Sequence, residues 1–197
     1  RWYNGYSRGG SERVYNPISL LQILKGGGLF RNFWFETGTP TFLLKEMKKH
    51  AYYDVAHTLA TSADLSNFDL RRLNPVTVLF QTGYLTVERY EPADLLYTLD
   101  YPNLEVKHSL QQVLLNEYLD YPRESGLPRV VALRNALQSK DLSQVVEIIN
   151  AAFAEIPGEL WRGKTEHFYH AVPHLMFSLL GTYIQSAARS AKGRCAA

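Results

Sequence analysis

Three histidines near the C-terminus have the spacing of side chains on one helical face. His167, His170 and His174 are three and four residues apart, and Glu166 precedes the first of them. Imidazole and carboxylate groups placed in this way can bind zinc. A tetrahedral ion usually takes further ligands from a second element, and the pattern is not the His-Glu-x-x-His pair of zinc proteases. A metal site and ordinary helix histidines both fit the spacing. We favour the second interpretation and assign no metal ligand.

Three consecutive glycines, Gly26 to Gly28, are the second place where the sequence could do chemistry. A glycine-rich loop can cradle a phosphate at the start of a helix. These glycines instead end a predicted helix over residues 16–24, in which Ile18, Leu21 and either Ile23 or Leu24 are available for burial. No Gly-Lys-Ser/Thr follows them, and no Gly-x-Ser-x-Gly occurs in the chain. We therefore predict no cofactor-binding residue and no complete active site.

The stretch over residues 29–40 is the most aromatic in the chain. Together with the next helix, predicted from residue 41 to about 50, it supplies Phe30, Phe33, Trp34, Phe35 and Phe42. These rings could stack on bases or a ligand, but aromatic side chains also dominate the cores of ordinary domains. We favour the core interpretation, and the partner that Trp34 faces stays open.

The elements that must position these residues are organised around residues 73–103. Asparagine before proline at one end and glycine at the other predict a short helix over 74–83. Alternating apolar and polar residues predict a strand over 84–90, followed by a tight turn at 91–94 and a return strand over 95–99. A helix followed by a two-stranded hairpin is the second half of a winged helix, in which the hairpin is the wing.

Apolar residues three and four apart predict further helices after the wing. One begins at Asn103, and two more are predicted over 127–139 and 141–156. The last of these opens with the capping pair Asp141 and Gln144. Its apolar face comprises Leu142, Val145, Val146, Ile149 and Phe153. Since no strand separates these helices, we expect a helical connector.

A final helix is predicted over residues 165–180, with Gly181 as its end and a kink at Pro173. Its expected buried residues are Phe168, Val172, Leu175, Met176 and Leu179. Residues 182–188 could then begin a strand. The predicted fold is mainly α with a small β-hairpin: a winged-helix-like domain followed by a helical connector.

The composition bounds the class of protein. With 197 residues and 46% hydrophobic content, the chain can bury one core or two small ones. Its net charge of +2 does not indicate nucleic acid. One cysteine, Cys195, fits a reducing cytoplasm, and no apolar run is long enough to cross a membrane. Because the chain starts at Arg1 and stops after a basic run, we expect a fragment of a longer cytoplasmic protein.

Five sequence blocks resemble a known family. They are WYNGY at 2–6, VYNP at 14–17, WFETGTP at 34–40, LFQTGYLT at 79–86 and YPNLEV at 101–106. In this order they resemble the C-terminal half of uncharacterised bacterial AAA-ATPase-like proteins that carry a predicted PD-(D/E)XK nuclease domain. The resemblance implies a P-loop ATPase domain before Arg1, with ATP and Mg²⁺ as cofactors of the parent protein. It also implies four regions: an ATPase lid part at 1–60, a winged-helix-like domain at 61–121, a helical connector at 122–163 and the start of a truncated nuclease-like domain at 164–197.

The resemblance also concerns the end of the chain. Glu166 and the residues after it resemble the first helix of the nuclease domain, so Glu166 is the one catalytic acid that carries over. Such nucleases hold Mg²⁺ on an aspartate and a later Glu-x-Lys pair. The sequence has Ala196 where the aspartate is expected, and Ala187 stands where another acid is expected. Either the aspartate is substituted, or Ala196 and Ala197 are not the natural residues.

Three hypotheses follow, in our order of preference. The first is a non-catalytic region that couples the nucleotide state of the parent protein to its nuclease or to a protein partner. The second is a DNA-binding winged helix, supported by Arg71, Arg72 and Arg89, although residues 74–82 contain no lysine or arginine. The third is a nuclease that is active once its domain is complete. The expected partners are the protein's own ATPase and nuclease domains, DNA or another protein, and no membrane.

Overall fold

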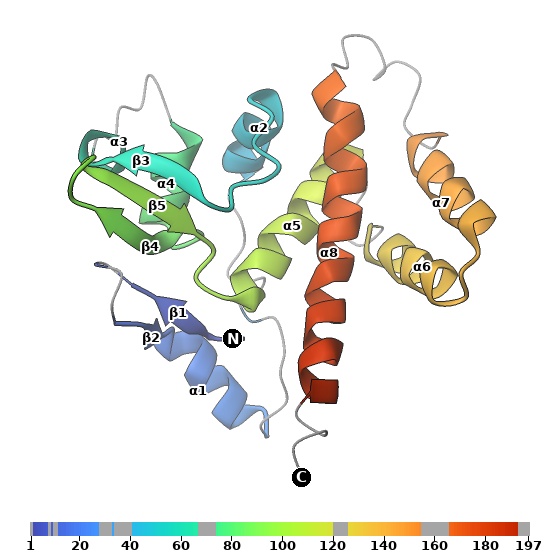
Figure 1. Cartoon of the computed structure of the whole chain (residues 1–197), viewed down its shortest axis with the longest axis horizontal. Coiled ribbons are helices and arrows are strands. Elements are labelled where there is room, and N and C mark those ends of the chain that lie inside the picture. Colours follow the sequence, from blue (N-terminus) through green and yellow to red (C-terminus); the bar gives the residue numbers. More distant parts are fainter. Residues whose placement is uncertain are drawn as a thin grey trace. The chain divides into compact units, whose positions relative to one another are not determined.

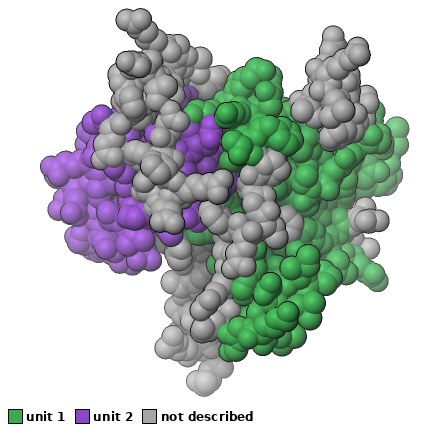
Figure 2. All heavy atoms as spheres, turned by 180° about the vertical axis from the view of Figure 1, so that it is seen from behind, with its two compact units in different colours: residues 1–110 green, residues 111–197 purple. Residues whose placement is uncertain are grey.

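The described part of the chain forms two compact units. The computed structural model describes residues 2–7, 9, 12–27, 33, 41–66, 74–119, 126–154 and 166–192, and in the last helix it describes side chains up to Gly181, with the exception of His167. The units are Arg1–Leu110 and Gln111–Ala197, coloured separately in Figure 2. The division falls within helix α5 (Leu104–Leu119).

A three-stranded antiparallel sheet is the centre of unit 1 (Figure 1). Its strands are β3 (Thr58–Thr61), β4 (Thr86–Glu91) and β5 (Leu96–Asp100), in the order β3-β5-β4. The predicted hairpin is confirmed, because β4 pairs antiparallel with β5. Leu95 has a φ of 55°, a left-handed conformation that closes the turn, so β5 begins one residue later than predicted.

Three helices lie beside this sheet: α2 (Thr41–Lys49), α3 (Ser62–Ser66) and α4 (Pro75–Gln81). The start of α4 is as predicted. Asn74 Oδ1 accepts the Val76 N–H at 3.0 Å, and Pro75 occupies the first turn. The buried apolar residues of this part include Leu43, Met47, Val55, Val76, Leu79, Leu85 and Leu99.

The N-terminal segment forms a two-stranded hairpin and a helix. Strand β1 (Asn4–Tyr6) pairs irregularly with β2 (Val14–Tyr15). Helix α1 (Pro17–Lys25) follows, and Asn16 Oδ1 accepts the Ile18 N–H at 2.9 Å as its N-cap. The predicted helix at this place is confirmed.

The prediction of which side of α1 is buried was wrong. Ile18, Leu21 and Leu24 are 60%, 58% and 71% exposed, whereas Ser19 is 2% exposed. Ser19 is buried because its hydroxyl donates to Glu105 Oε2 at 3.0 Å. A polar contact, rather than the apolar residues, therefore fixes which face of α1 turns inward.

Unit 2 is helical. It comprises the second part of α5, α6 (Gly126–Gln138), α7 (Leu142–Ala154) and α8 (Glu166–Lys192). Helix α6 packs against both α7 and α8. The ring of Phe168 lies 6.0 Å from that of Tyr118 and 6.3 Å from that of Phe153, so side chains of α5, α7 and α8 meet there.

Two predictions about these helices need correction. Helix α8 does not end at Gly181 but continues to Lys192, and no strand forms over 182–188. A single glycine costs a helix only about 1 kcal/mol relative to alanine, and the alanine-rich sequence that follows favours helix. In α7, Val145 is buried, but Leu142 and Val146 are 70% and 56% exposed. The predicted buried residues of α8 are all confirmed.

The described residues therefore form a mainly α protein with small antiparallel sheets, as the sequence predicted. Among them, no helix has the length and apolar character that crossing a bilayer requires. The order of elements is that of a winged helix: helix α2, strand β3, helices α3 and α4, and the β4–β5 hairpin. The winged-helix fold itself stays a prediction.

Candidate functional site

Glu166, the predicted catalytic acid, is the first residue of α8 and faces solvent. Its side chain is 87% exposed, and its Oε1 lies 3.3 Å from His170 Nε2, one helical turn later. His174 is half-buried, and the side chain of His167 lies outside the described residues. Residues 193–197, including Ala196, also lie outside them. The described side chains thus give Glu166 one exposed contact with His170, and contacts of this kind are typically worth little.

The α4 helix, which would read DNA in a winged helix, has little free polar surface. Its first five residues are buried, and Gln81, at its exposed end, donates its Nε2 to the Leu65 carbonyl at 3.2 Å. Arg89 in β4 is exposed, whereas Arg71 and Arg72 lie outside the described residues. Exposed Glu91 and the turn residue Asp94 bring negative charge to the hairpin, which opposes a phosphate backbone.

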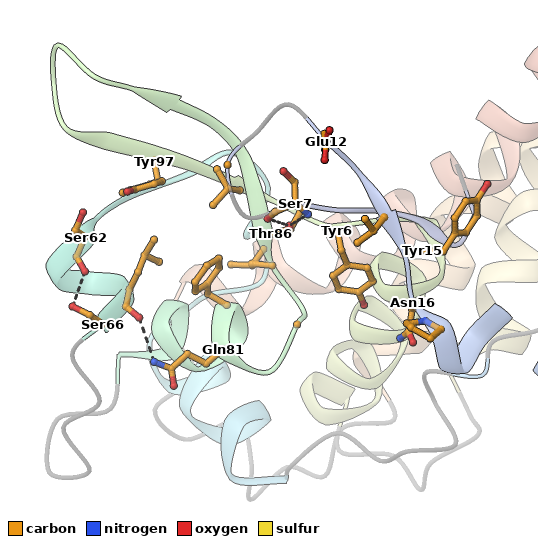
Figure 3. Close-up of a pocket in the computed structure, with 18 residues that line it drawn as sticks. Tyr6, Ser7, Glu12, Tyr15, Asn16, Ser62, Ser66, Gln81, Thr86 and Tyr97 are labelled. Carbon is orange, nitrogen blue, oxygen red and sulfur yellow. Dashed lines mark hydrogen bonds between the residues drawn. The ribbon is translucent and has the colours of Figure 1, made fainter. Parts of the chain in front are cut away.

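The structure instead shows an open cleft of about 1090 Å³ in unit 1 (Figure 3). One wall is the β1–β2 hairpin with the start of α1, and the other walls are α3, α4 and the β4–β5 hairpin. The lining includes Tyr6, Asn16, Ser62, Phe80, Gln81 and Tyr97.

Polar contacts hold the floor and one wall of the cleft, and those of Thr86 are buried. The Thr86 hydroxyl bonds both backbone groups of Ser7, with 2.7 Å for each bond. Gln81 and Ser66 are fixed through bonds to the Leu65 and Ser62 carbonyls. Burial raises the pKa of the Tyr6 hydroxyl, and the Asn16 side chain opposes that shift only in part. Tyr6 is therefore a neutral hydrogen-bonding group at physiological pH.

The cleft combines aromatic rings with neutral hydrogen-bonding groups. Tyr6, Phe80 and Tyr97 supply rings, while Asn16 and Gln81 supply amides. Among the lining residues that the structure describes, Glu12 is the charged one. Aromatic surface with a few neutral polar groups suits the backbone and side chains of a peptide segment better than it suits a phosphate.

An exposed apolar surface adjoins this cleft, since Val14 and Tyr15 belong to both. Val14 is 59% and Tyr15 is 51% exposed, and the exposed residues of α1 follow directly in the chain. We call this set the β2–α1 surface; it comprises Val14, Tyr15, Ile18, Leu21 and Leu24. Clustered exposed apolar residues of this kind mark interaction surfaces.

The fold and these surfaces define a mainly α protein with small antiparallel sheets and an open cleft. The chain is similar to a protein of Azotobacter chroococcum mcd 1 that is described only as an uncharacterized protein in the vnfD 5′ region. The two are 36% identical over 201 residues, and the match covers 98% of this chain. The chain spans 38% of the length of that relative. No family model matches the chain. No solved structure matches it either.

Sequence reasoning missed the cleft. Its lining comes from residues 6–17, 62–66, 80–87 and 97, and no local spacing joins these segments. Of the aromatic stretch over residues 29–40, the structure describes Phe33 alone, and this residue is buried. Phe42, in the helix that follows, is 49% exposed.

Proposed function

We propose that this chain is a non-catalytic lid, winged-helix and connector region of an ATPase–nuclease protein, and that it couples nucleotide state to the nuclease or to a partner. The observation that carries the proposal is the β2–α1 surface beside the cleft. Ile18, Leu21 and Leu24 are more than half exposed. A surface helix normally buries its apolar side chains against the core of its own domain.

The exposed side chains imply a contact. Full burial of one leucine or isoleucine gains roughly 1.5–3 kcal/mol, so three of them on one short helix offer a partner a substantial gain. We assign that contact to the ATPase domain that the resemblance places before Arg1. The cleft would then take a peptide segment of the same domain.

The parent protein would use ATP and Mg²⁺ in its ATPase domain. Glu166 would contribute the first-helix acid of the nuclease domain, for which its exposed position at the start of α8 leaves room. The single cysteine, Cys195, fits the cytoplasmic location that we propose for the protein. The Azotobacter relative, which is much longer than the matched region, is compatible with further domains.

The experiment compares amide hydrogen exchange in the full-length protein, with and without ATP and Mg²⁺, and in the isolated chain. We expect residues 17–25 to exchange more slowly in the full-length protein, by a factor that changes when ATP binds. The double variant Leu21→Glu/Leu24→Glu should abolish the difference. Leu142→Glu, at an equally exposed leucine of α7, is the matched control and should leave it unchanged.

Two results would contradict the proposal. Equal exchange of residues 17–25 in both proteins would mean that the β2–α1 surface has no partner in the full-length protein. ATP hydrolysis by the isolated chain would mean that the chain is itself an enzyme.

A DNA-binding winged helix is the second candidate. The order β3-β5-β4 and the hairpin after α4 favour it, whereas the buried face of α4 and the acidic residues near the hairpin turn oppose it. Titration of a DNA duplex at two salt concentrations decides between the two candidates. Salt-sensitive binding that Arg89→Ala weakens would favour DNA, and its absence would favour protein contacts.

A further inference from the structure

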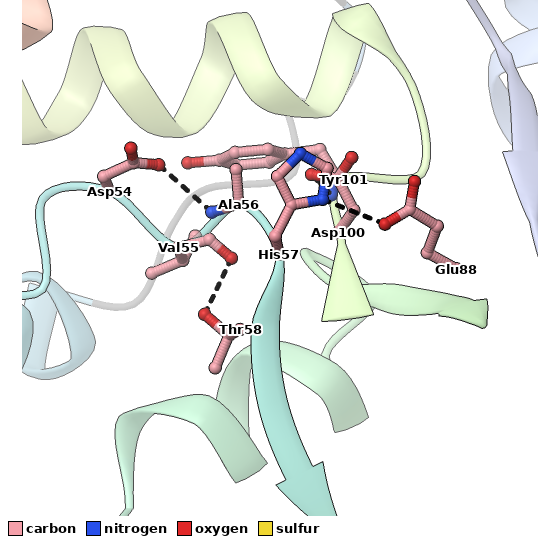
Figure 4. A network of polar contacts seen from close by, with 8 residues as sticks. All are labelled: Asp54, Val55, Ala56, His57, Thr58, Glu88, Asp100 and Tyr101. Carbon is pink, nitrogen blue, oxygen red and sulfur yellow. Dashed lines mark hydrogen bonds and ion pairs between the residues drawn. The ribbon is translucent and has the colours of Figure 1, made fainter. Parts of the chain in front are cut away.

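Three potential metal ligands meet at one end of the three-stranded sheet (Figure 4). His57, Glu88 and Asp100 each offer one ligand atom, and these atoms all lie within 4.8 Å of one another. Glu88 follows His57 by 31 positions, and Asp100 follows Glu88 by 12, so no local sequence motif identifies the group. They lie in unit 1, outside the cleft and outside the α8 histidines.

Strand pairing brings the three residues together. Thr58 of β3 pairs with Leu99 of β5, so His57 lies next to Asp100 across the same two strands. Glu88 is the extra residue of a bulge in β4, since Val87 pairs with Leu99 and Arg89 with Thr98. A bulge redirects a side chain away from the regular pleat, and here the redirected carboxylate meets the imidazole.

The segment before β3 holds His57 in place. His57 has a φ of 53°, which non-glycine residues adopt rarely. Asp54 Oδ1 accepts the Ala56 N–H at 3.1 Å, and the Thr58 hydroxyl donates to the Val55 carbonyl at 2.9 Å. These bonds flank the left-handed residue on both sides, as Figure 4 shows, so the imidazole is presented from an ordered turn.

The ligand atoms are already close to the spacing that a metal needs. His57 Nδ1 lies 2.9 Å from Glu88 Oε2. Asp100 Oδ1 accepts the Tyr101 N–H at 2.7 Å, which orients the carboxyl group and leaves its other oxygen for a cation. Ligands of a tetrahedral zinc ion lie about 3.4 Å apart, given metal–ligand distances of about 2.0–2.2 Å. The three ligand atoms, which all lie within 4.8 Å of one another, are thus near that spacing.

The charges also favour a cation. Two carboxylates face one imidazole, and Asp100 is half-buried. A divalent ion would neutralise both carboxylates while the imidazole binds through Nδ1.

We propose that His57, Glu88 and Asp100 bind one zinc ion. One imidazole nitrogen with two carboxylate oxygens suits zinc, whereas Mg²⁺ and Ca²⁺ prefer oxygen ligands alone. Three protein ligands leave a fourth position for water. The ion ties β4 and β5 to the turn before β3, and so it stabilises the sheet that the hairpin belongs to. The assignment is independent of the proposed coupling function.

The experiment titrates the isolated chain with ZnCl₂ by calorimetry, and with CoCl₂ by visible absorption, after removal of metals. We expect one ion per chain and a d–d spectrum typical of low coordination number, with no comparable binding of MgCl₂. His57→Asn keeps a residue that tolerates the left-handed conformation, and Asp100→Asn keeps the bond to Tyr101. Each should weaken zinc binding at least about 10-fold.

Two matched variants test the location of the site. His50→Asn alters the pair that His50 Nε2 makes with Glu46 Oε2 at 3.4 Å, and His170→Asn alters the pair on α8. Both should bind zinc like the parent chain. Zinc binding retained by His57→Asn, binding lost in His170→Asn, or no binding by the parent chain would each overturn the proposal. Circular dichroism of every variant confirms that its helices are retained.

Discussion

The Thr86 side chain holds both backbone groups of Ser7. Its hydroxyl oxygen accepts the Ser7 N–H at 2.7 Å, and the same hydroxyl donates to the Ser7 carbonyl at 2.7 Å. Both residues are buried. The Val87 N–H approaches the same carbonyl at 3.4 Å. Because Ser7 follows β1 and Thr86 begins β4, this pair fastens the N-terminal hairpin to the edge of the sheet and forms the floor of the cleft.

Replacement of Thr86 by valine tests this fastening. Thr86→Val keeps the shape but leaves the N–H and carbonyl of Ser7 without the hydroxyl, and an unsatisfied buried polar group costs about 1–3 kcal/mol. We expect the free energy of unfolding, measured by urea denaturation, to fall by that amount. Thr86→Ser keeps the hydroxyl and should lose less. A larger loss in Thr86→Ser than in Thr86→Val would show that methyl packing, not the hydrogen bonds, matters here.

Gly5 gives a second test of the same hairpin. A Cβ atom at this position would lie 1.6 Å from the Pro102 carbonyl oxygen, and the φ of 154° is one that other residues rarely adopt. Backbone atoms cannot move aside as a side-chain end can, so Gly5→Ala should destabilise unit 1 by about 3 kcal/mol or more. Thermal unfolding measures the loss. Gly9→Ala, where nothing lies within 4 Å of the added atom, is the control.

The elements that the sequence predicted well carry local signals. Asn74 and Pro75 cap α4, and Asp141 Oδ1 accepts the Gln144 N–H at 2.9 Å at the start of α7, as their sequence patterns indicated. The apolar stripe of α8 likewise identified residues that are buried. Signals of this kind depend on a few neighbouring residues, so no tertiary information is needed to use them.

Features that depend on tertiary contacts could not be predicted. The stripe of α1 shows that Ile18 and Leu21 share a face, but the buried Glu105 decides that Ser19 turns inward. The zinc ligands that we propose meet only because of strand register and the bulge at Glu88. The strand that follows His57 was not predicted, and nothing in the sequence indicated which carboxylates would face this histidine.

His108 predicts a pH dependence of stability. Burial lowers the pKa of this imidazole in the folded state below its usual value of about 6.5. The unfolded chain therefore binds more protons between the two pKa values, so stability present at pH 8 is lost as the pH falls below about 6.5. We expect urea denaturation at pH 5 and pH 8 to show a smaller loss for His108→Gln than for the parent chain.

The comparison with the variant is needed because His57 acts in the opposite sense. Its hydrogen bond with Glu88 raises the pKa of His57, so this group contributes stability at low pH that is lost as the pH rises. His57 is largely exposed, which keeps its contribution small. A pH dependence that is identical in His108→Gln and the parent chain would contradict the assignment to His108.

Glu105 predicts a coupling between segments that are far apart in the chain. This fully buried carboxylate accepts the Phe33 N–H at 2.7 Å through Oε1 and the Ser19 hydroxyl at 3.0 Å through Oε2. Glu105→Gln can still accept from Phe33 and donate to the Ser19 oxygen, so we expect a loss of about 1–2 kcal/mol. Glu105→Met leaves both donors without this acceptor and should cost about 3 kcal/mol or more.

A double-mutant cycle separates the Ser19 contact from the rest. In Ser19→Ala the hydroxyl is already absent, so adding Glu105→Met should cost less than it does in the parent chain, with a coupling energy of about 0.5–3 kcal/mol. Urea denaturation of the four proteins gives that energy directly. Because Ser19 is the residue that turns the apolar side of α1 outward, a positive coupling would mean that the buried Glu105 carboxylate helps to keep the β2–α1 surface available to a partner. A coupling of zero would mean that α1 is held by other contacts and that its exposed leucines need a different explanation.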